Sequence, residues 1–360
     1  MSNKQRLVHL VGSIPLADAE SVFENVGRIL KGSVKRIPDG ETGTRNNWIA
    51  WQLPLLETNP NLEPDPDAGK PTGQSAEDGL AVDKRSFRFL RVKPGTDATN
   101  LDLQTEYARH ATESFRKFDE LQAAGKIPAG VRFQVSLPTP YAVASLYVSP
   151  ASWSAFLPAY ERAILRDLEI IMTSIPHAKL AIQWDVCMEV IAWERQVRSP
   201  EDDLERFTFD SISRLCDAVP ETIDVGIHLC YGDPGHKHIV EPKDMKILVA
   251  MASGISAATA RSLNWIHMPV PKERDDVAYF AALADLELDT GCELYLGLVH
   301  FTDQDEGAAK RIRSACTVVQ DFGIATECGF GRRPPTTVIP LLELHQRCAT
   351  ATAPGEHESG

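Results

Sequence analysis

Eight short apolar runs, each suited to a buried β-strand, are spread along this chain of 360 residues and alternate with segments of helical periodicity. The expected strands are 7–13, 34–39, 131–137, 180–187, 224–230, 264–269, 292–300 and 324–329. The clearest helical stripe has apolar side chains at spacings of four and three residues: Phe156, Tyr160, Ile164, Leu168 and Ile171. A strand followed by a helix, repeated eight times, predicts an α/β fold with a single (β/α)8 TIM barrel.

One long segment interrupts this order. After the second expected strand, about 53–100 is rich in Pro, Asp, Asn and Gly, and loops of this length are uncommon unless they are functional or disordered. A lid, an extra hairpin, a subunit contact in a homo-oligomer and a plain mobile insertion all fit this composition. We expect 1–348 to form one barrel domain and 349–360, which is small and polar, to be a disordered tail.

The net charge indicates which partners are disfavoured for this chain, and the cysteines indicate where in the cell it is located. With 50 Asp and Glu against 37 Lys and Arg, the net charge of -13 disfavours binding to nucleic acid or to an anionic membrane. Seven cysteines without paired spacing indicate reduced thiols and a cytoplasmic protein. The N-terminal residues lack the long apolar core of a signal peptide, and no later run approaches the length that spans a membrane.

Three soft metal ligands lie near the ends of two of the expected strands. In an extended strand, residues i and i+2 point to the same face, so His228 and Cys230 can bind one ion while Cys328 approaches it from another strand. Three protein ligands leave one position for water or substrate, and thiolate-rich sites favour zinc, so the pattern indicates a catalytic Zn²⁺ site. The alternative is that both cysteines are ordinary small buried residues.

The other unusual polar residues also fall at strand ends. Active sites of (β/α)8 barrels lie where the carboxyl ends of the strands meet, so these residues are expected to lie around the same opening. In chain order they are Gly12-Ser13, Asp39-Gly40-Glu41, Asp185, His228 and Cys230, His267, His300, and Glu327-Cys328.

Six short motifs, in order along almost the whole chain, are similar to those of a known family. They are Val11-Gly12-Ser13, Asp39-Gly40-Glu41, Gln183-Trp184-Asp185, His228-Leu229-Cys230-Tyr231, His300, and Cys328-Gly329-Phe330-Gly331-Arg332-Arg333. The set resembles the catalytic domain of cobalamin-independent methionine synthase, a (β/α)8 enzyme that uses zinc to activate the thiol of homocysteine for attack on a methyl carbon. This chain resembles a stand-alone catalytic barrel, because it has no room for the synthase's second barrel.

The resemblance implies roles for individual residues. Ser13, Glu41 and Asp185 bind substrate, and His300 acts as an acid that protonates the leaving group. Asp185 ends an apolar strand, where an unpaired charge would cost several kcal/mol, so it needs a partner such as a substrate amino group or a loop amide. Glu41 in the turn, and His300 as a neutral hydrogen-bonded residue, have structural alternatives as well.

Arg333 is the first candidate to pair with a substrate carboxylate or sulfonate, with Arg45 and Arg332 as weaker candidates. Five cysteines and two histidines match no motif and are interpreted as structural. They are Cys187, Cys216, Cys292, Cys316, Cys348, His236 and His238.

The chain departs from the family at the sixth expected strand. There the family has a Glu that also binds zinc, whereas 265–270 reads WIHMPV in this chain, so His267 is either a fourth ligand or a hydrogen-bonded core residue. A His, Cys, Cys set is also similar to that of zinc-dependent epoxyalkane:coenzyme M transferases.

The sequence therefore predicts a zinc-dependent methyl- or alkyltransferase, methionine synthase-like, whose partners are a small-molecule thiol and an alkyl donor. The alternatives are a thiol–epoxide transferase, a carbon–sulfur lyase, or a barrel that binds a metal or small molecule without catalysis.

Overall fold

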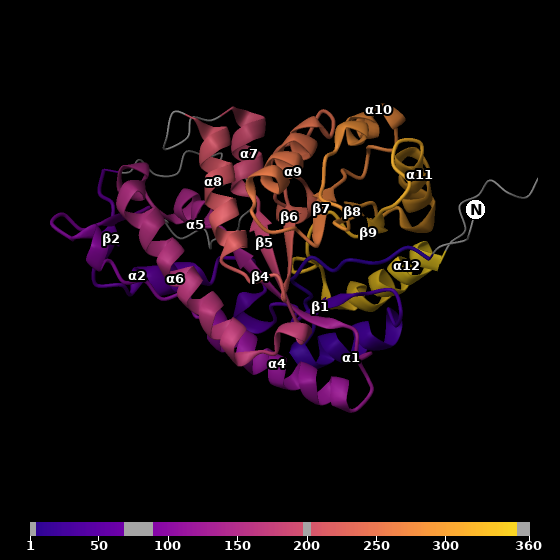
Figure 1. Ribbon diagram of the computed structural model, residues 1–360, viewed down its shortest axis with the longest axis horizontal. Coiled ribbons are helices and arrows are strands. Elements are labelled where there is room, and N and C mark those ends of the chain that lie inside the picture. Colours follow the sequence, from indigo (N-terminus) through magenta and orange to yellow (C-terminus); the bar gives the residue numbers. More distant parts are fainter. Residues whose placement is uncertain (1–4, 68–88, 197–202, 351–360) are drawn as a thin grey trace, which may run out of the picture.

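The computed structural model describes residues 5–67, 89–196 and 203–350. Figure 1 shows a central sheet with helices packed around it. The helices are α1 (Ala19–Ile29), α2 (Gln52–Glu57), α4 (Tyr107–Ala123), α5 (Pro140–Tyr147), α6 (Trp153–Ser174), α7 (Met188–Arg195), α8 (Leu204–Asp217), α9 (Lys246–Ala258), α10 (Val277–Phe280), α11 (Gln304–Cys316) and α12 (Val338–Thr350). Short 3-10 turns are η1 (Gly43–Arg45), η2 (Ala98–Asn100), η3 (Pro150–Ser152), η4 (His177–Lys179), η5 (Pro234–His236), η6 (Ala281–Asp285) and η7 (Pro335–Thr337).

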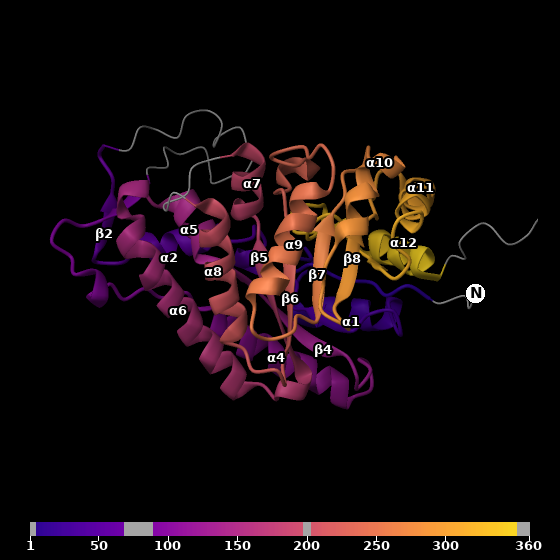
Figure 2. The same cartoon turned by 45° about the horizontal axis from the view of Figure 1, so that its top comes forward.

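The main sheet is parallel throughout and has the order β1-β4-β5-β6-β7-β8-β9. Its strands are β1 (Arg36–Pro38), β4 (Arg132–Pro138), β5 (Leu180–Val186), β6 (Asp224–Leu229), β7 (Trp265–Pro269), β8 (Glu293–Gly297) and β9 (Gly323–Ile324). In both views the helices lie outside the sheet (Figures 1 and 2). Their contacts form a ring, because α12 packs on both α1 and α11. The α/β fold with a TIM-like curled sheet is confirmed.

The predicted closed eight-stranded barrel is wrong in one respect, because 7–13 does not form a strand. Val8 makes single bridges to Val34 and Ile324, on the two ends of the sheet, and Ser13 makes one to Gly40. One neighbour, β9, is only two residues long, too short to support a ladder.

Side chains replace the missing ladder along this segment. The amide nitrogen of Gln134 donates to the carbonyl oxygens of Leu10 and Val11, at 3.0 Å each. The amide nitrogen of Gln183 donates to Val11 O at 2.6 Å. Buried backbone groups need partners, and glutamines on β4 and β5 provide them here in place of a strand.

The other expected strands are present, most of them with shorter bounds, while β4 keeps its expected length and is shifted by one residue. The largest difference is at 324–329, where only Gly323–Ile324 is a strand and the chain then leaves the sheet as the loop that carries Cys328. At the C-terminus, α12 extends to Thr350 and Ala349 is buried, so these two residues belong to the fold and not to the expected tail. Residues 351–360 lie outside the described part of the chain.

The segment expected as an insertion contains α2, η2 and a separate antiparallel pair of strands, β2 (Leu62–Pro64) and β3 (Leu90–Val92). The pair is attached to the rest of the molecule by β3, because Leu90 bridges Val148 and its carbonyl accepts from Ser149 N at 2.9 Å. Both views place β2 far from α11 and α12 (Figures 1 and 2). Residues 68–88, in the middle of this segment, lie outside the described part.

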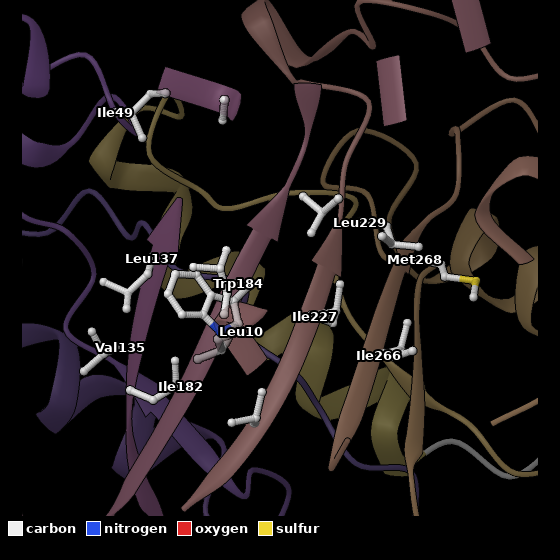
Figure 3. Packing of buried hydrophobic residues seen from close by; sticks show 14 of the residues in the cluster. Leu10, Ile49, Val135, Leu137, Ile182, Trp184, Ile227, Leu229, Ile266 and Met268 are labelled. Atoms are coloured by element: carbon white, nitrogen blue, oxygen red, sulfur yellow. The ribbon is translucent and has the colours of Figure 1, made fainter. Parts of the chain in front are cut away.

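The two faces of the sheet have different chemistry because successive side chains of a strand point to opposite faces. Apolar side chains such as Ile182, Trp184, Ile227 and Leu229 belong to the large core between sheet and helices (Figure 3). The alternate positions face inward. Near the strand starts they hold a small separate cluster of Ala181, Trp265 and Tyr295, and near the strand ends they are polar. Those inward polar positions are Gln134, Ser136, Gln183, Asp185, His228 and His267.

Among the described residues, no helix is long and apolar enough to cross a membrane.

Gly226 is required by the close approach of the Trp265 ring inside the sheet. A Cβ on Gly226 would lie 2.0 Å from atoms of that ring. The guanidinium of Arg36 lies over the same ring, 4.0 Å from its centroid. We predict that Gly226→Ala destabilises the protein by about 1–3 kcal/mol or more, because the core must move to accept the methyl group. Gly130→Ala, where nothing lies within 4 Å of the new Cβ, is the control. Urea unfolding of both variants measures the difference, and equal stability would contradict this account.

Candidate metal centre

His228, Cys230 and Cys328 converge at the carboxyl end of the sheet. One ligand atom from each lies within 4.8 Å of the other two, and the two sulfurs are 3.7 Å apart. His228 lies in β6, Cys230 follows the end of that strand, and Cys328 lies in the loop after β9. Two sulfurs bound to one tetrahedral zinc ion at ~2.3 Å are separated by about 3.8 Å. The donor set and its spacing therefore fit zinc.

A chain of hydrogen bonds fixes which nitrogen of His228 faces the two sulfurs. His267 Nε2 lies 3.0 Å from the carbonyl oxygen of Thr326, which can only accept, so Nε2 carries a proton. Burial lowers the pKa of His267 to about 3, so this ring is neutral and its Nδ1 is an acceptor. That Nδ1 lies 2.7 Å from His228 Nδ1, which must donate.

The consequence is a free lone pair on His228. Burial, with a contribution from His267, lowers the pKa of His228 well below its usual value, so its ring is also neutral. With a proton on Nδ1, a neutral imidazole has its lone pair on Nε2, which is the form that binds a metal. Both nitrogens of His267 take part in these hydrogen bonds, so His267 supports His228 through the Nδ1 of that ring, opposite the free lone pair.

A pocket opens beside the three ligands and encloses about 580 Å³ of empty space, its mouth included. Three of the sequence candidates for substrate binding, Ser13, Glu41 and Asp185, line it together with the ligands. The remaining lining residues are Val11, Gly12, Trp48, Cys187, Gly232, Asp233, Pro234, Ile239, Gly329 and Arg332. The carboxylates and the potential metal ligands thus share one space.

Two carboxyl groups of the pocket, those of Glu41 and Asp185, are held in an unfavourable environment for charge. Burial raises the pKa of Asp185 to about 7, although Gln183 and Trp48 donate hydrogen bonds to it at 2.9 and 3.2 Å. Burial and the nearby Asp185 raise the pKa of Glu41 well above its usual value. A cationic group entering the pocket would relieve the repulsion and favour ionisation of both carboxyl groups.

Glu41 is brought into the pocket by a strained turn. Its φ is 48°, a left-handed conformation uncommon for a residue with a side chain, and its N–H donates to Asp39 at 2.8 Å. Arg45 in turn forms a buried ion pair with Asp39 at 2.6 Å. Asp39 and Arg45 therefore hold the turn, and Glu41 faces the pocket.

Two sequence candidates lie elsewhere. His300 does not line the pocket, because its Nε2 donates to Val270 O at 2.9 Å and its Nδ1 is 3.6 Å from Glu327. Arg333 is buried outside the pocket, and its Nε has no hydrogen-bond partner among the residues that the structure describes.

The adjacent Arg332 lines the pocket instead. Its Nε donates to Asp233 O at 2.5 Å, and its Nη2 is 3.7 Å from the sulfur of Cys328. Trp48 and Cys187 also line the pocket but were not among the sequence candidates. Cys187 was detectable, since it lies two residues after Asp185 at the same strand end. Trp48 lies in an irregular turn for which the sequence has no comparable pattern.

No protein-family model and no curated protein matches the sequence of this chain. Its fold does match solved structures. One is a putative vitamin-B12-independent methionine synthase from Listeria monocytogenes, with a TM-score of 0.55, 12% identity, and coverage of 96% of this chain and 98% of that one. A B12-independent methionine synthase from Shewanella sp. W3-18-1 in complex with selenomethionine has a TM-score of 0.59, 12% identity, and 96% coverage of both chains. A methyltransferase from Methanosarcina mazei has a TM-score of 0.53, 12% identity, and coverage of 96% and 95%. At this identity the likeness establishes a shared fold.

The raised pKa of Asp185 predicts a loss of stability with rising pH. Between about pH 4 and pH 7 the folded protein keeps a proton that the unfolded chain has lost, so the free energy of unfolding falls as pH rises through this window. Asp185→Asn should reduce this fall.

Urea unfolding of metal-free protein at pH 5 and pH 8 gives the pH-dependent change for each protein. The parent and Asp185→Asn are then compared by this change in the free energy of unfolding between the two pH values. The loss of a hydrogen bond that asparagine cannot keep is the same at both pH values, so it does not contribute to the change. An identical pH dependence in both proteins would show that Asp185 ionises normally.

Proposed function

We propose that this protein is a zinc-dependent methyl- or alkyltransferase that activates a small thiol for attack on an alkyl donor. The observation that carries the proposal is the pair of sulfurs 3.7 Å apart, with a neutral imidazole, in a pocket that Glu41 and Asp185 also line. The shared fold with methionine synthase and methyltransferase structures supports it.

The donor set suits thiol activation. Zinc bound here would lower the pKa of a coordinated thiol, so that thiolate is available at neutral pH. His228, Cys230 and Cys328 would hold the ion, and two thiolates with one neutral imidazole balance its charge. The substrate sulfur therefore keeps its electron density for attack on carbon.

The carboxyl groups indicate a substrate with an amino group. Glu41 is half-buried and Asp185 is buried in the pocket, and neither forms an ion pair among the described residues, so an ammonium group could pair with both. Selenomethionine, which the Shewanella structure contains, is an amino acid with such a group. Homocysteine, the thiol that the sequence resemblance suggests, has the same group and a sulfur that can reach the metal.

Arg332 and His300 have different proposed roles. Arg332 is better placed than Arg333 to attract an anionic group of the substrate, because it lines the pocket. His300 remains the proposed proton donor to the leaving group. To deliver a proton to the leaving group, the His300 side chain would first have to break the hydrogen bond from its Nε2 to the Val270 carbonyl oxygen.

Cys328→Ser and His228→Ala should each lose zinc while the fold is retained. The ligands lie at strand ends and in a loop, separate from the core that stabilises the barrel. Metal analysis and circular dichroism on the same samples measure both properties, with Cys292→Ser, a half-buried cysteine outside the site, as the control. The parent should hold about one zinc per chain. Full zinc occupancy in either ligand variant would rule out this site.

Homocysteine should bind the zinc-loaded protein and depend on the two carboxylates. Removing one partner of a buried ion pair costs about 2–5 kcal/mol, so Glu41→Gln and Asp185→Asn should weaken binding by tenfold or more. The matched ligand 4-mercaptobutyrate lacks only the amino group and should bind the variants no worse than the parent. Titration calorimetry decides, and binding that needs no zinc would contradict the proposal.

His267 should control the affinity for zinc through the proton that His228 holds. His267→Leu removes the acceptor for His228 Nδ1–H, and loss of such a supporting partner typically costs about 10- to 100-fold in metal affinity. His267→Gln can accept from His228 and donate to Thr326 O, so it should recover part of the loss. Competition with a chelator measures both variants. Unchanged affinity in His267→Leu would show that the hydrogen bond does not orient the ligand.

A further inference from the structure

A third cysteine lies beside the proposed metal ligands. Cys187 directly follows β5, two residues after Asp185, and lines the same pocket as Cys230 and Cys328. Its side chain is 3% exposed. Sequence patterns indicate only a structural residue here, because no motif contains Cys187.

The Cys187 side chain is in direct contact with a proposed ligand. Cys187 and Cys230 pack with Ile191 in one small cluster. Trp48 and Cys328 border the same cluster. The Cys187 sulfur thus lies on the pocket side of the site, next to the position where zinc would sit.

Three ligands leave one position of a tetrahedral zinc ion to be filled when no substrate is bound. His267 cannot fill it as it stands, because both of its nitrogens are hydrogen-bonded. Asp185 is held by Gln183 and Trp48. Among the residues that the structure describes, none forms a hydrogen bond with the Cys187 thiol that would hold it in this way, and thiolate is a ligand that zinc favours.

We propose that Cys187 is the fourth zinc ligand of the substrate-free protein and that the substrate thiol replaces it. This proposal rests on the proposed function. Cys187 is not within the tight group formed by the other three ligand atoms, so coordination requires its side chain to turn to another staggered rotamer.

The exchange has a definite proton balance. On binding zinc, the Cys187 thiol would lose its proton to solvent and hold the ion through the thiolate sulfur. An arriving substrate thiol would take the place of Cys187 on the ion, and its proton would pass to the released Cys187 sulfur. No net proton reaches the solvent in this exchange. In Cys187→Ala, water fills the fourth position, and the same substrate would release about one proton when it displaces that water.

X-ray absorption at the zinc edge tests the resting site in the zinc-loaded parent and in Cys187→Ala. We expect three sulfur neighbours and one nitrogen in the parent, and two sulfurs in the variant. Cys292→Ala, outside the pocket, should match the parent. Two sulfurs in the parent would overturn this inference but leave the proposed function intact, whereas no zinc–sulfur signal would overturn both. The parent's sulfur count decides even if Cys187→Ala does not fold.

Titration calorimetry with homocysteine, in buffers of different ionisation enthalpy, counts the protons released. The parent should release close to none, and Cys187→Ala or Cys187→Ser about one. Equal release from parent and variants would contradict the exchange.

Discussion

The parallel register of neighbouring strands is the constraint on which the site depends. Asp185 in β5 pairs with His228 in β6, and His228 pairs with His267 in β7. Because these three residues have the same register and all point inward, a carboxyl group, a potential metal ligand and its supporting imidazole lie in one row at the carboxyl end of the sheet. Cys230 needs only to continue β6 by one residue, which its N–H to Val186 O at 3.0 Å allows.

The polar interior of the sheet follows from the same geometry. Inward side chains near the strand ends need hydrogen-bond partners because they are buried, and the amide nitrogens of Gln134 and Gln183 find them in the backbone at Leu10 and Val11. Gln183 also donates to Asp185, so the same side chain supports the irregular first segment and a pocket carboxyl group. The irregular first segment and the pocket are thus joined by one side chain.

Sequence patterns predicted the regular parts well and the loops poorly. The strands β4 to β7 and the convergence of His228, Cys230 and Cys328 follow from apolar runs and from alternation along a strand. Loops have no such regular alternation, so the sequence does not indicate which way their side chains point. The sequence therefore favoured Arg333, whereas Arg332 lines the pocket. It left open whether His267 binds metal or is a hydrogen-bonded core residue, and the structure places it against His228. Cys187 was interpreted as structural because it matches no motif, and its contact with Cys230 joins the ends of two strands, which a motif along one strand does not contain.

The central claim is that one zinc ion binds between His228 Nε2 and the sulfurs of Cys230 and Cys328. Anomalous diffraction from crystals of zinc-loaded protein, collected on both sides of the zinc absorption edge, tests it most directly. The account predicts one strong peak per chain at bonding distance from these three atoms, with His267 Nδ1 still hydrogen-bonded to His228. A peak at another place, or none in this pocket at full zinc loading, would contradict it.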